Sequence, residues 1–251
     1  HPARNMRTYT PYWAKTDREN PDSTLWRPFA WHVAAVVACA ERLCILQPIK
    51  LHRIATLLGT SEKEALKVVV VAAALHDLGK LHCLFQSKNY LGFQRTYDTD
   101  PTPYTTPRRG QKAGPESRVM ADNPNWFHGT DGDVAFEKLY PWNPDVQLAA
   151  HYGSIHHGSA PEESRSKNVR VWVHDALEGG WLEFKQDVRA MREFVDDVLQ
   201  FHEAASFPKF PRFHVEVGQI IAGIVAEADW LGSNESMFPC EATWAPHDYV
   251  T

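Results

Sequence analysis

Apolar residues recur with a helical period through much of this chain. Between Leu25 and Leu46 they return every three or four residues until Pro48 interrupts the pattern. A second run starts at Ser61, where Ser61 and Glu64 match a capping box, and continues through "ALKVVVVAAALHD". Although consecutive valines are also typical of a strand, the cap, the alanines and the length favour a buried helix. We therefore expect two long helices here.

The same helical period returns in later segments, and strand signals are rare. Helices are predicted in "DGDVAFEKLY", "NPDVQLAAHYGSI", "EFKQDVRAMREFVDDVLQFHEAA" and "HVEVGQIIAGIVAEADWLGS", whereas "VRVWV" is the one convincing strand-like fragment. A chain of 251 residues can bury one sizeable core but is short for two enzyme domains. The prediction is a single all-α domain over residues 1–251, a helical bundle without internal repeats.

The segment from residue 87 to 125 is polar and rich in turn residues. It is longer than compact domains usually tolerate without a functional cause, but a disordered insertion explains it equally well. Arg108, Arg109 and Lys112 make it locally basic, which suits a phosphate backbone or simply a solvated charge run. Both alternatives stay open. At the other end of the chain, Met6 is a candidate native start, and residues 1–5 receive no weight.

Composition narrows the class of protein further. The formal net charge of -5 gives no global sign of nucleic-acid binding, so any such binding would need a local basic patch or a recruiting partner. No apolar run reaches the roughly 18 residues of a membrane span, and the N-terminus lacks the apolar core of a signal peptide. The four cysteines show no C-x-x-C spacing, which predicts free thiols rather than disulfides or a thiolate zinc site. We expect a cytoplasmic protein that does not enter membranes.

Candidate chemistry appears where the second apolar run ends on His76 and Asp77. A buried imidazole beside a buried carboxylate is costly to desolvate, and a bound cation is one of the few partners that offsets both costs. For a single pair, a core histidine followed by a capping aspartate is the better interpretation. However, residues of ligand type also lie at the edges of other apolar segments: His32, His128, His156, His157 and Asp229.

Helical geometry supports grouping these residues. Asp229 falls on the flank of the apolar stripe of the last predicted helix and should face inward. Adjacent residues on a regular helix point about 100° apart, so His156 and His157 could share a site only near a helix end, where Gly158 lets the chain turn. Each residue alone has a purely structural explanation, such as a hydrogen bond to a carbonyl or an ion pair. Their recurrence favours a metal site.

The remaining histidines serve as internal controls. His174-Asp175 and His247-Asp248 do not close long apolar helices and are left out of the site. The others are interpreted as surface or packing residues: His52, His82, His151, His202 and His214.

These residues carry a family resemblance. The stretch "HDLGK", with His32 upstream and Asp229 downstream, resembles the H…HD…D pattern of HD-superfamily phosphohydrolases. Five stretches in order, "YWAKT", "HDLGKLHCLFQ", "WFHG", "IHHG" and "ADWLGS", resemble the HD nuclease domain of the CRISPR-associated nuclease-helicase of type I systems, in particular the subtype that works with the Cascade complex. The likeness extends from Tyr12 to Ser233 and implies an HD-superfamily helical bundle around a buried metal site.

The resemblance implies a role for each candidate. One metal would be held by His32, His76, Asp77 and Asp229, and a second by His128, His156 and His157, with Asp77 bridging the two. Lys80 matches a lysine that the family places near the substrate phosphate, so Asp77 and Lys80 are the candidate catalytic residues. Imidazole and carboxylate ligands without thiolate suit two divalent ions such as manganese, iron, nickel or cobalt.

The function expected from this resemblance is metal-dependent hydrolysis of single-stranded DNA in CRISPR interference, as an endonuclease or an exonuclease. The chain contains no G-x-x-x-x-G-K-[ST] loop, so a helicase module would act in cis or in trans, together with the CRISPR RNA-guided surveillance complex. Two alternatives rank lower: an HD-type phosphohydrolase of small nucleotides, and a metal-stabilised binding module without catalysis. The ligand set together with Lys80 exceeds what stabilisation alone needs.

Overall fold

Helices make up nearly all of the regular structure that the computed structural model describes, namely residues 7–16, 25–88, 93, 96–97, 128–139, 144–158, 182–201 and 214–240. The α-helices are α1 (Phe29–Leu46), α2 (Pro48–Leu58), α3 (Glu62–Leu75), α4 (Cys83–Gln86), α7 (Thr130–Leu139), α8 (Pro144–Ser154), α10 (Leu182–Phe201) and α11 (Val215–Gly232). Two 3-10 turns, η1 (Leu78–Lys80) and η4 (Ile155–His157), and two short strands, β1 (Trp13–Thr16) and β2 (Trp26–Pro28), complete them. The prediction of an all-α bundle is confirmed.

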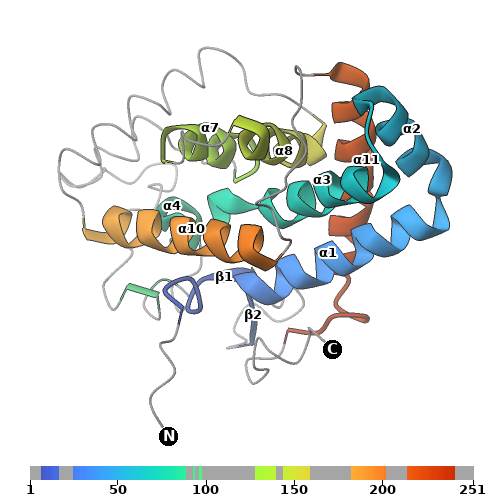
Figure 1. Ribbon diagram of the computed structural model, residues 1–251. Coiled ribbons are helices and arrows are strands. Elements are labelled where there is room, and N and C mark those ends of the chain that lie inside the picture. The colour runs from blue at the N-terminus through green and yellow to red at the C-terminus, as the bar shows by residue number, and fades with distance from the viewer. Residues whose placement is uncertain are drawn as a thin grey trace, which may run out of the picture.

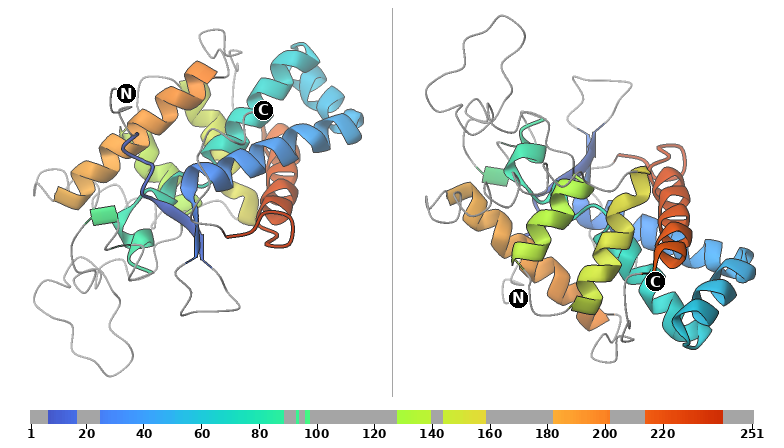
Figure 2. Two further views of the ribbon diagram at one scale, coloured as in Figure 1. Left: turned by 90° about the horizontal axis from the view of Figure 1, so that it is seen from below. Right: turned by 90° about the horizontal axis from the view of Figure 1, so that it is seen from above.

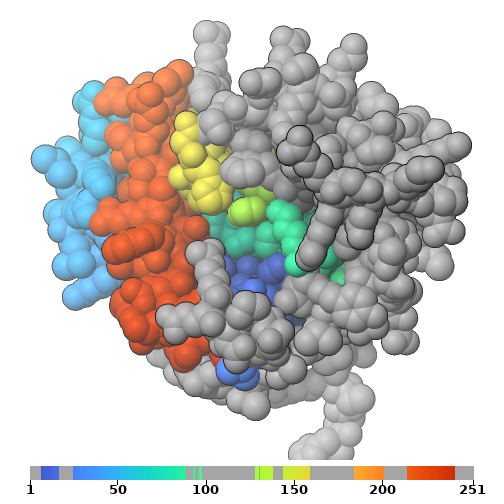
Figure 3. All heavy atoms as spheres, turned by 180° about the vertical axis from the view of Figure 1, so that it is seen from behind, coloured from blue at the N-terminus to red at the C-terminus, as the bar shows by residue number. Residues whose placement is uncertain are grey.

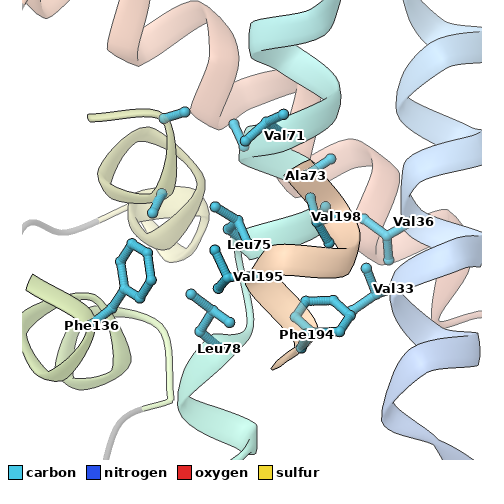
Figure 4. Packing of buried hydrophobic residues seen from close by; sticks show 14 of the residues in the cluster. Val33, Val36, Val71, Ala73, Leu75, Leu78, Phe136, Phe194, Val195 and Val198 are labelled. Atoms are coloured by element: carbon cyan, nitrogen blue, oxygen red, sulfur yellow. The ribbon is translucent and has the colours of Figure 1, made fainter. Parts of the chain in front are cut away.

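Helix α3 lies at the centre of the bundle. It contacts α1, α2, α8 and α11, and α1 also packs along α11 (Figures 1 and 2). Every residue from Val68 to Leu75 is buried. Figure 4 shows Val33 and Val36 of α1 and Phe136 of α7 among the side chains that surround this core. Because α3 is enclosed on several sides, its last residues are delivered into the interior.

The predicted cap of α3 forms in part. The Ser61 hydroxyl accepts a hydrogen bond from the backbone N–H of Glu64 at 3.2 Å, as expected for an N-cap. The Glu64 carboxylate lies 3.4 Å from the ammonium of Lys67. The valine run is helical, so the cap and the length outweighed its β-propensity.

The first predicted helix ends at Leu46 as expected, but it starts later and its last residue is not buried. Residues Trp26–Pro28 form β2, and α1 starts only at Phe29. Leu46, expected on the inward stripe, is 63% exposed. Pro48 ends the pattern as predicted, but it also opens α2, because proline fits the first turn of a helix, where its missing N–H is not needed.

The small sheet is the main element that the hydrophobic pattern does not predict. Strands β1 and β2 pair antiparallel, with an irregular register between Trp13 and Lys15. Strands of three and four residues are too short to show a clear alternation of apolar and polar positions. The predicted strand "VRVWV" and nearly all of residues 87–125 lie outside the described residues.

Two further expectations from composition can be compared with the fold. All four cysteines are free thiols, as predicted. Helix α1, in contrast to the expectation, is long and apolar enough by length and composition to cross a membrane. Half of this helix is buried, and its packing against α3 and α11 accounts for the apolar residues on the buried side as part of the core.

The approach of α8 to α3 provides a test of this packing. A Cβ added at Gly153 of α8 would lie 2.2 Å from the carbonyl oxygen of Ala72 and 3.2 Å from the Cα of His76. Because backbone atoms cannot move aside cheaply, we expect Gly153→Ala to lower the free energy of unfolding by about 1–3 kcal/mol, measured by urea denaturation.

The matched control is Gly223→Ala on α11, where an added Cβ would meet nothing within 4 Å. This substitution should leave stability unchanged or raise it by about 1 kcal/mol through helix propensity. Equal effects of the two substitutions would contradict the packing described here.

Candidate metal centre

The end of α3 places His76 and Asp77 side by side in the interior, where both are 0% exposed. His76 closes the helix, and Asp77 precedes the 3-10 turn η1. The Nδ1–H of His76 donates to the carbonyl oxygen of Ala73 at 2.6 Å, which directs its Nε2 at Asp77 Oδ2, 3.1 Å away. The helix end therefore fixes both the position and the tautomer of the histidine.

Asp77 presents each of its oxygens to a different set of partners. Its Oδ2 lies 2.9 Å from Nε2 of His32 and 3.1 Å from Nε2 of His76, and it accepts a hydrogen bond from the ammonium of Lys80. Its Oδ1 faces Nε2 of His128 at 3.2 Å. Asp77 therefore connects two groups of side chains.

The first group consists of His32, His76, Asp77 and Asp229, whose ligand atoms all lie within 4.8 Å of one another. Asp229 comes from α11, and its Oδ1 is 3.3 Å from Nε2 of His32 and 3.7 Å from Nε2 of His76. The hydroxyl of Ser233 donates to the same oxygen at 2.9 Å. The inward orientation predicted for Asp229 is confirmed.

The second group consists of His128, His156 and His157, again with ligand atoms within 4.8 Å. His156 and His157 lie on η4, directly after α8, and Gly158 follows with a φ of 88° in the left-handed region. The Nδ1–H of His156 donates to the carbonyl oxygen of Gly153 at 2.7 Å. The predicted turn at Gly158 thus allows two adjacent histidines to share one site.

The donor atoms fit divalent transition metals. Asp77 Oδ1 and His156 Nε2 are buried and make no hydrogen bond within the described part of the chain. Buried polar atoms without such partners are costly, and a cation in the second group, with Asp77 as a shared ligand, would satisfy both. The carbonyl contacts at Nδ1 are those that orient metal-binding imidazoles, and a set of nitrogen and oxygen donors suits manganese, iron, cobalt or nickel.

Burial keeps most of the histidines neutral, as metal ligation requires. It lowers the pKa of His32 to about 4, of His156 to about 3 and of His128 to about 2. For His76 burial also lowers the pKa, but the carboxylates of Asp77 and Asp229 outweigh it and raise the value to about 9. Without metal, His76 carries part of the positive charge that the carboxylates need.

Lys80 is buried inside the cluster of ligand-type residues. Its residue is 2% exposed, its ammonium contacts Asp77 Oδ2, and it lies 3.4 Å from Nε2 of His32. Burial raises the pKa of Asp77, but the charges of His76 and Lys80 overcome this and hold it well below its usual range. A contact between Lys80 and a substrate phosphate stays a prediction.

The cluster opens into a hollow on one face of the molecule (Figure 3). By their colours, the atoms around it belong to α11, to the end of the segment 144–158, to the segment 128–139, to the part of the chain around η1 and to the N-terminal strands. Exposure decreases through the cluster: His157 is exposed, the side chains of His128 and Asp229 are 19% and 15% exposed, and that of Asp77 is 0% exposed.

Three residues around the cluster were not singled out from the sequence, although each lies in a stretch that carries the resemblance. Gln86 donates from Nε2 to the carbonyl oxygens of Trp13 and Lys80, at 2.9 and 2.7 Å, and so ties β1 to η1. The Lys15 ammonium lies 3.9 Å from Asp229 Oδ1, and Ser233 hydrogen-bonds the same oxygen. Hydrophobic periodicity gives no signal for contacts of this kind, because they depend on the tertiary fold.

Three of the control histidines behave as predicted. His52 lies on the surface, 3.0 Å from Glu62, and Nδ1 of His214 accepts from a backbone N–H at the start of α11. His151 lies 2.7 Å from Asp133, outside both groups. His202 and the two other His-Asp pairs fall outside the described residues.

A third cluster of ligand-type residues, His82, Cys83 and Asp187, was not expected. Asp187 Oδ1 accepts hydrogen bonds from the hydroxyls of Tyr12 and Tyr97 at 2.7 and 2.5 Å, and its Oδ2 accepts from the N–H of Cys83 at 2.8 Å. Burial raises the pKa of Asp187 to about 7. Because neutral donors already satisfy both oxygens, this cluster is a structural junction between β1, α4 and α10.

Comparison with known proteins agrees with this architecture. The profile of the family described as "Cas3, HD domain" matches residues 13–238. A CRISPR-associated nuclease/helicase Cas3 from Streptococcus thermophilus is 22% identical over 240 residues, which cover 91% of this chain and 25% of that protein. The chain thus spans about a quarter of the length of this curated relative.

Solved structures show the same fold. The Cas3 HD domain of Thermus thermophilus, crystallised in the presence of Ni²⁺, has a TM-score of 0.56 at 20% identity, covering 95% of this chain and 83% of that chain. T. fusca Cas3 matches with a TM-score of 0.56 at 22% identity, covering 92% and 23%. A chain of a CRISPR RNA-guided surveillance complex in a pre-nicking state matches with a TM-score of 0.54 at 23% identity, covering 91% and 25%.

The enclosed position of Lys80 predicts a metal-dependent effect on stability. Lys80→Met removes a buried cation from Asp77, so the metal-free protein should lose about 3–5 kcal/mol of unfolding free energy. Excess Mn²⁺ should restore most of this loss, because the metal supplies the missing charge. Urea denaturation with chelator and with Mn²⁺ measures the difference.

The control for this prediction is Lys67→Met. Lys67 pairs with Glu64 near the other end of α3, and this pair should contribute less than about 1 kcal/mol with or without metal. If Lys80→Met destabilised the protein equally in both conditions, its contribution would be packing rather than charge compensation.

The burial of His82 predicts how the free energy of unfolding depends on pH. Burial lowers its pKa from 6.5 to about 3, so the stability it contributes is complete above pH 6.5 and is lost as pH falls toward 3. Between pH 7 and 5 this amounts to about 2 kcal/mol, at 1.36 kcal/mol per unit. His82→Asn keeps a side chain that can cap α4 and should remove that part of the loss in urea denaturation with chelator.

The control here is His52→Asn at an exposed position, which should leave the pH dependence unchanged. An identical loss in wild type and in His82→Asn would show that the buried imidazole does not contribute.

Proposed function

The chain belongs to the Cas3 HD-domain family, and from this premise we propose that it is a metal-dependent nuclease that hydrolyses phosphodiester bonds of single-stranded DNA in type I CRISPR interference. The observation that carries the proposal is the position of Asp77. It is fully buried and turns one oxygen toward each of two groups of nitrogen and oxygen donors. This arrangement suits a pair of cations acting on one phosphodiester.

The metals and the residues around them have different tasks in the proposed site. Two divalent cations, when bound, supply Lewis-acid activation of water and of the phosphodiester. Asp77 serves both groups, while the carbonyl oxygens of Ala73 and Gly153 hold His76 and His156 in the tautomer that can ligate. Lys80 keeps Asp77 ionised and in place.

The balance of charge favours an anionic substrate. The two ligand groups contain only two carboxylates, Asp77 and Asp229, because their other members are histidines. Two divalent cations therefore leave the site positive, and the ammonium of Lys80 adds to this charge. An anionic phosphodiester neutralises the excess, whereas a protein that needed metal only for stability would gain nothing from it.

The shape of the site favours a single strand over a duplex. Asp77 is fully buried, while His157 and parts of His128 and Asp229 reach the hollow. A flexible strand can bend a phosphate toward the bottom of this hollow, which a stiff duplex cannot do without deformation. We propose two metals from the series manganese, iron, nickel and cobalt.

We further propose that the chain, as one domain, works with partners. Its net charge of -5 predicts weak affinity for DNA on its own. A helicase module, in cis or in trans, and an RNA-guided surveillance complex would deliver the strand. The relative from S. thermophilus, which is a nuclease/helicase, and the matching chain in a surveillance complex support this proposal. For a protein of such a system we propose a cytoplasmic location.

Cleavage of circular single-stranded DNA by the purified protein tests the proposed function. With Mn²⁺, Ni²⁺ or Co²⁺ the circle should be cut, and chelator should stop the reaction. His76→Ala and Asp77→Ala should each lower the rate by more than about a hundredfold, because loss of an outer-shell partner of a ligand alone costs about 10- to 100-fold. His52→Ala, a histidine on the surface, is the matched control and should retain full activity.

The metal content of each variant, determined by elemental analysis, completes the experiment. A wild-type protein that binds metal but cuts neither circular nor linear single strands would contradict the proposal. Hydrolysis of nucleoside triphosphates without DNA cleavage would instead identify a small-nucleotide phosphohydrolase.

A further inference from the structure

Lys15 stands out among the lysines around the cluster because it reaches the site from the sheet. It lies on β1, and its ammonium is 3.9 Å from Asp229 Oδ1. The ligands come from other elements, whereas β1 forms part of the wall of the hollow (Figure 3). The hydrogen bonds between Gln86 and Trp13 hold this strand in place beside η1.

Lys15 and Lys80 differ in access to the hollow. The side chain of Lys80 is 3% exposed and points at Asp77, whereas that of Lys15 is 17% exposed. A phosphate that approaches from solvent can therefore contact the side chain of Lys15 without displacing the buried pair of Lys80 and Asp77. Lys15 also has a flexible stem, so its charge can shift over several ångströms.

Metal binding changes the electrostatic situation of Lys15. In the protein without metal, the carboxylate of Asp229 attracts its ammonium. A divalent cation bound to that carboxylate would repel the ammonium, because both carry positive charge. The side chain then gains by turning toward the hollow, where an anion of the substrate compensates its charge.

We propose that Lys15 binds a phosphate of the DNA strand next to the phosphate that is cleaved. The inference rests on the proposed function and adds to it a residue that recognises the strand rather than the scissile bond. The metal ligands and Lys80 converge on one point, Asp77. Lys15 instead contacts Asp229, with its ammonium 3.9 Å from Oδ1. A substrate with a single phosphate would offer no neighbouring phosphate to Lys15.

A comparison of two substrates tests this role. Lys15→Gln should lower kcat/KM for oligothymidylate about ten- to hundredfold, the loss of one charge-assisted hydrogen bond, with most of the effect in KM. For bis(p-nitrophenyl) phosphate, which has no neighbouring phosphate, kcat/KM should stay within twofold of wild type. The slope of log kcat/KM against log salt for oligothymidylate should become shallower by about 0.7, the value for one single-strand phosphate contact.

Metal binding supplies a measurement that does not depend on activity. Lys15→Gln removes a cation near Asp229, so the bound Mn²⁺ measured by elemental analysis should be unchanged and its affinity, measured by calorimetry, equal or higher. Lys15→Arg should restore most of the activity on oligothymidylate. Lys67→Gln is the same change near the N-terminal end of α3, away from the cluster. It should leave kcat/KM for both substrates and the salt slope unchanged.

Several outcomes would overturn the inference. Equal losses on both substrates would place Lys15 at the scissile phosphate, and loss of bound Mn²⁺ would make it a support for Asp229. An active wild type with unchanged kinetics in Lys15→Gln would refute the inference alone. Inactivity of Mn²⁺-loaded wild type on both substrates would overturn the proposed function and the inference with it.

Discussion

The structure depends on the ionised carboxylate of Asp77 in the interior of the bundle. Asp77 is 0% exposed, and a buried charge of this kind is tolerated only when cations or strong hydrogen-bond donors surround it. Its partners are His76 beside it, Lys80 one turn later, His32 from α1 and His128 from the chain before α7. The packing of α1 and α7 around α3 therefore serves to bring these groups to one carboxylate.

A second buried carboxylate, Asp187, shows how strongly the pKa of a buried carboxyl group depends on its partners. Asp187, like Asp77, is almost fully buried. Its partners, however, are two tyrosine hydroxyls and a backbone N–H, all of them neutral. Burial raises the pKa of Asp187 to about 7, whereas positive neighbours hold the pKa of Asp77 well below its usual range. Equal burial thus produces a junction of the fold in one place and a cation site in the other.

The sequence predicted the helices and the site residues better than the connections between them. Long segments such as Glu62–Leu75 are recognised as helices because every buried apolar residue adds to the helical period. His156 and His157 could be assigned to one site because Gly158 indicates a turn after them. The sheet could not be predicted, because strands of three and four residues repeat the signal too few times. Contacts such as Gln86 with Trp13 depend on tertiary packing alone, and no local pattern encodes them.

Local and overall charge oppose each other in this protein. The chain as a whole carries a formal net charge of -5, yet its metal centre joins two carboxylates to histidines that burial keeps neutral. Two divalent cations would make the bottom of the hollow positive inside an acidic molecule. Under the proposed function, the long-range field would not attract DNA, whereas the site would bind a phosphate strongly once it arrives. Such a charge distribution would give selectivity, because a partner that delivers the strand would decide which DNA reaches the metals.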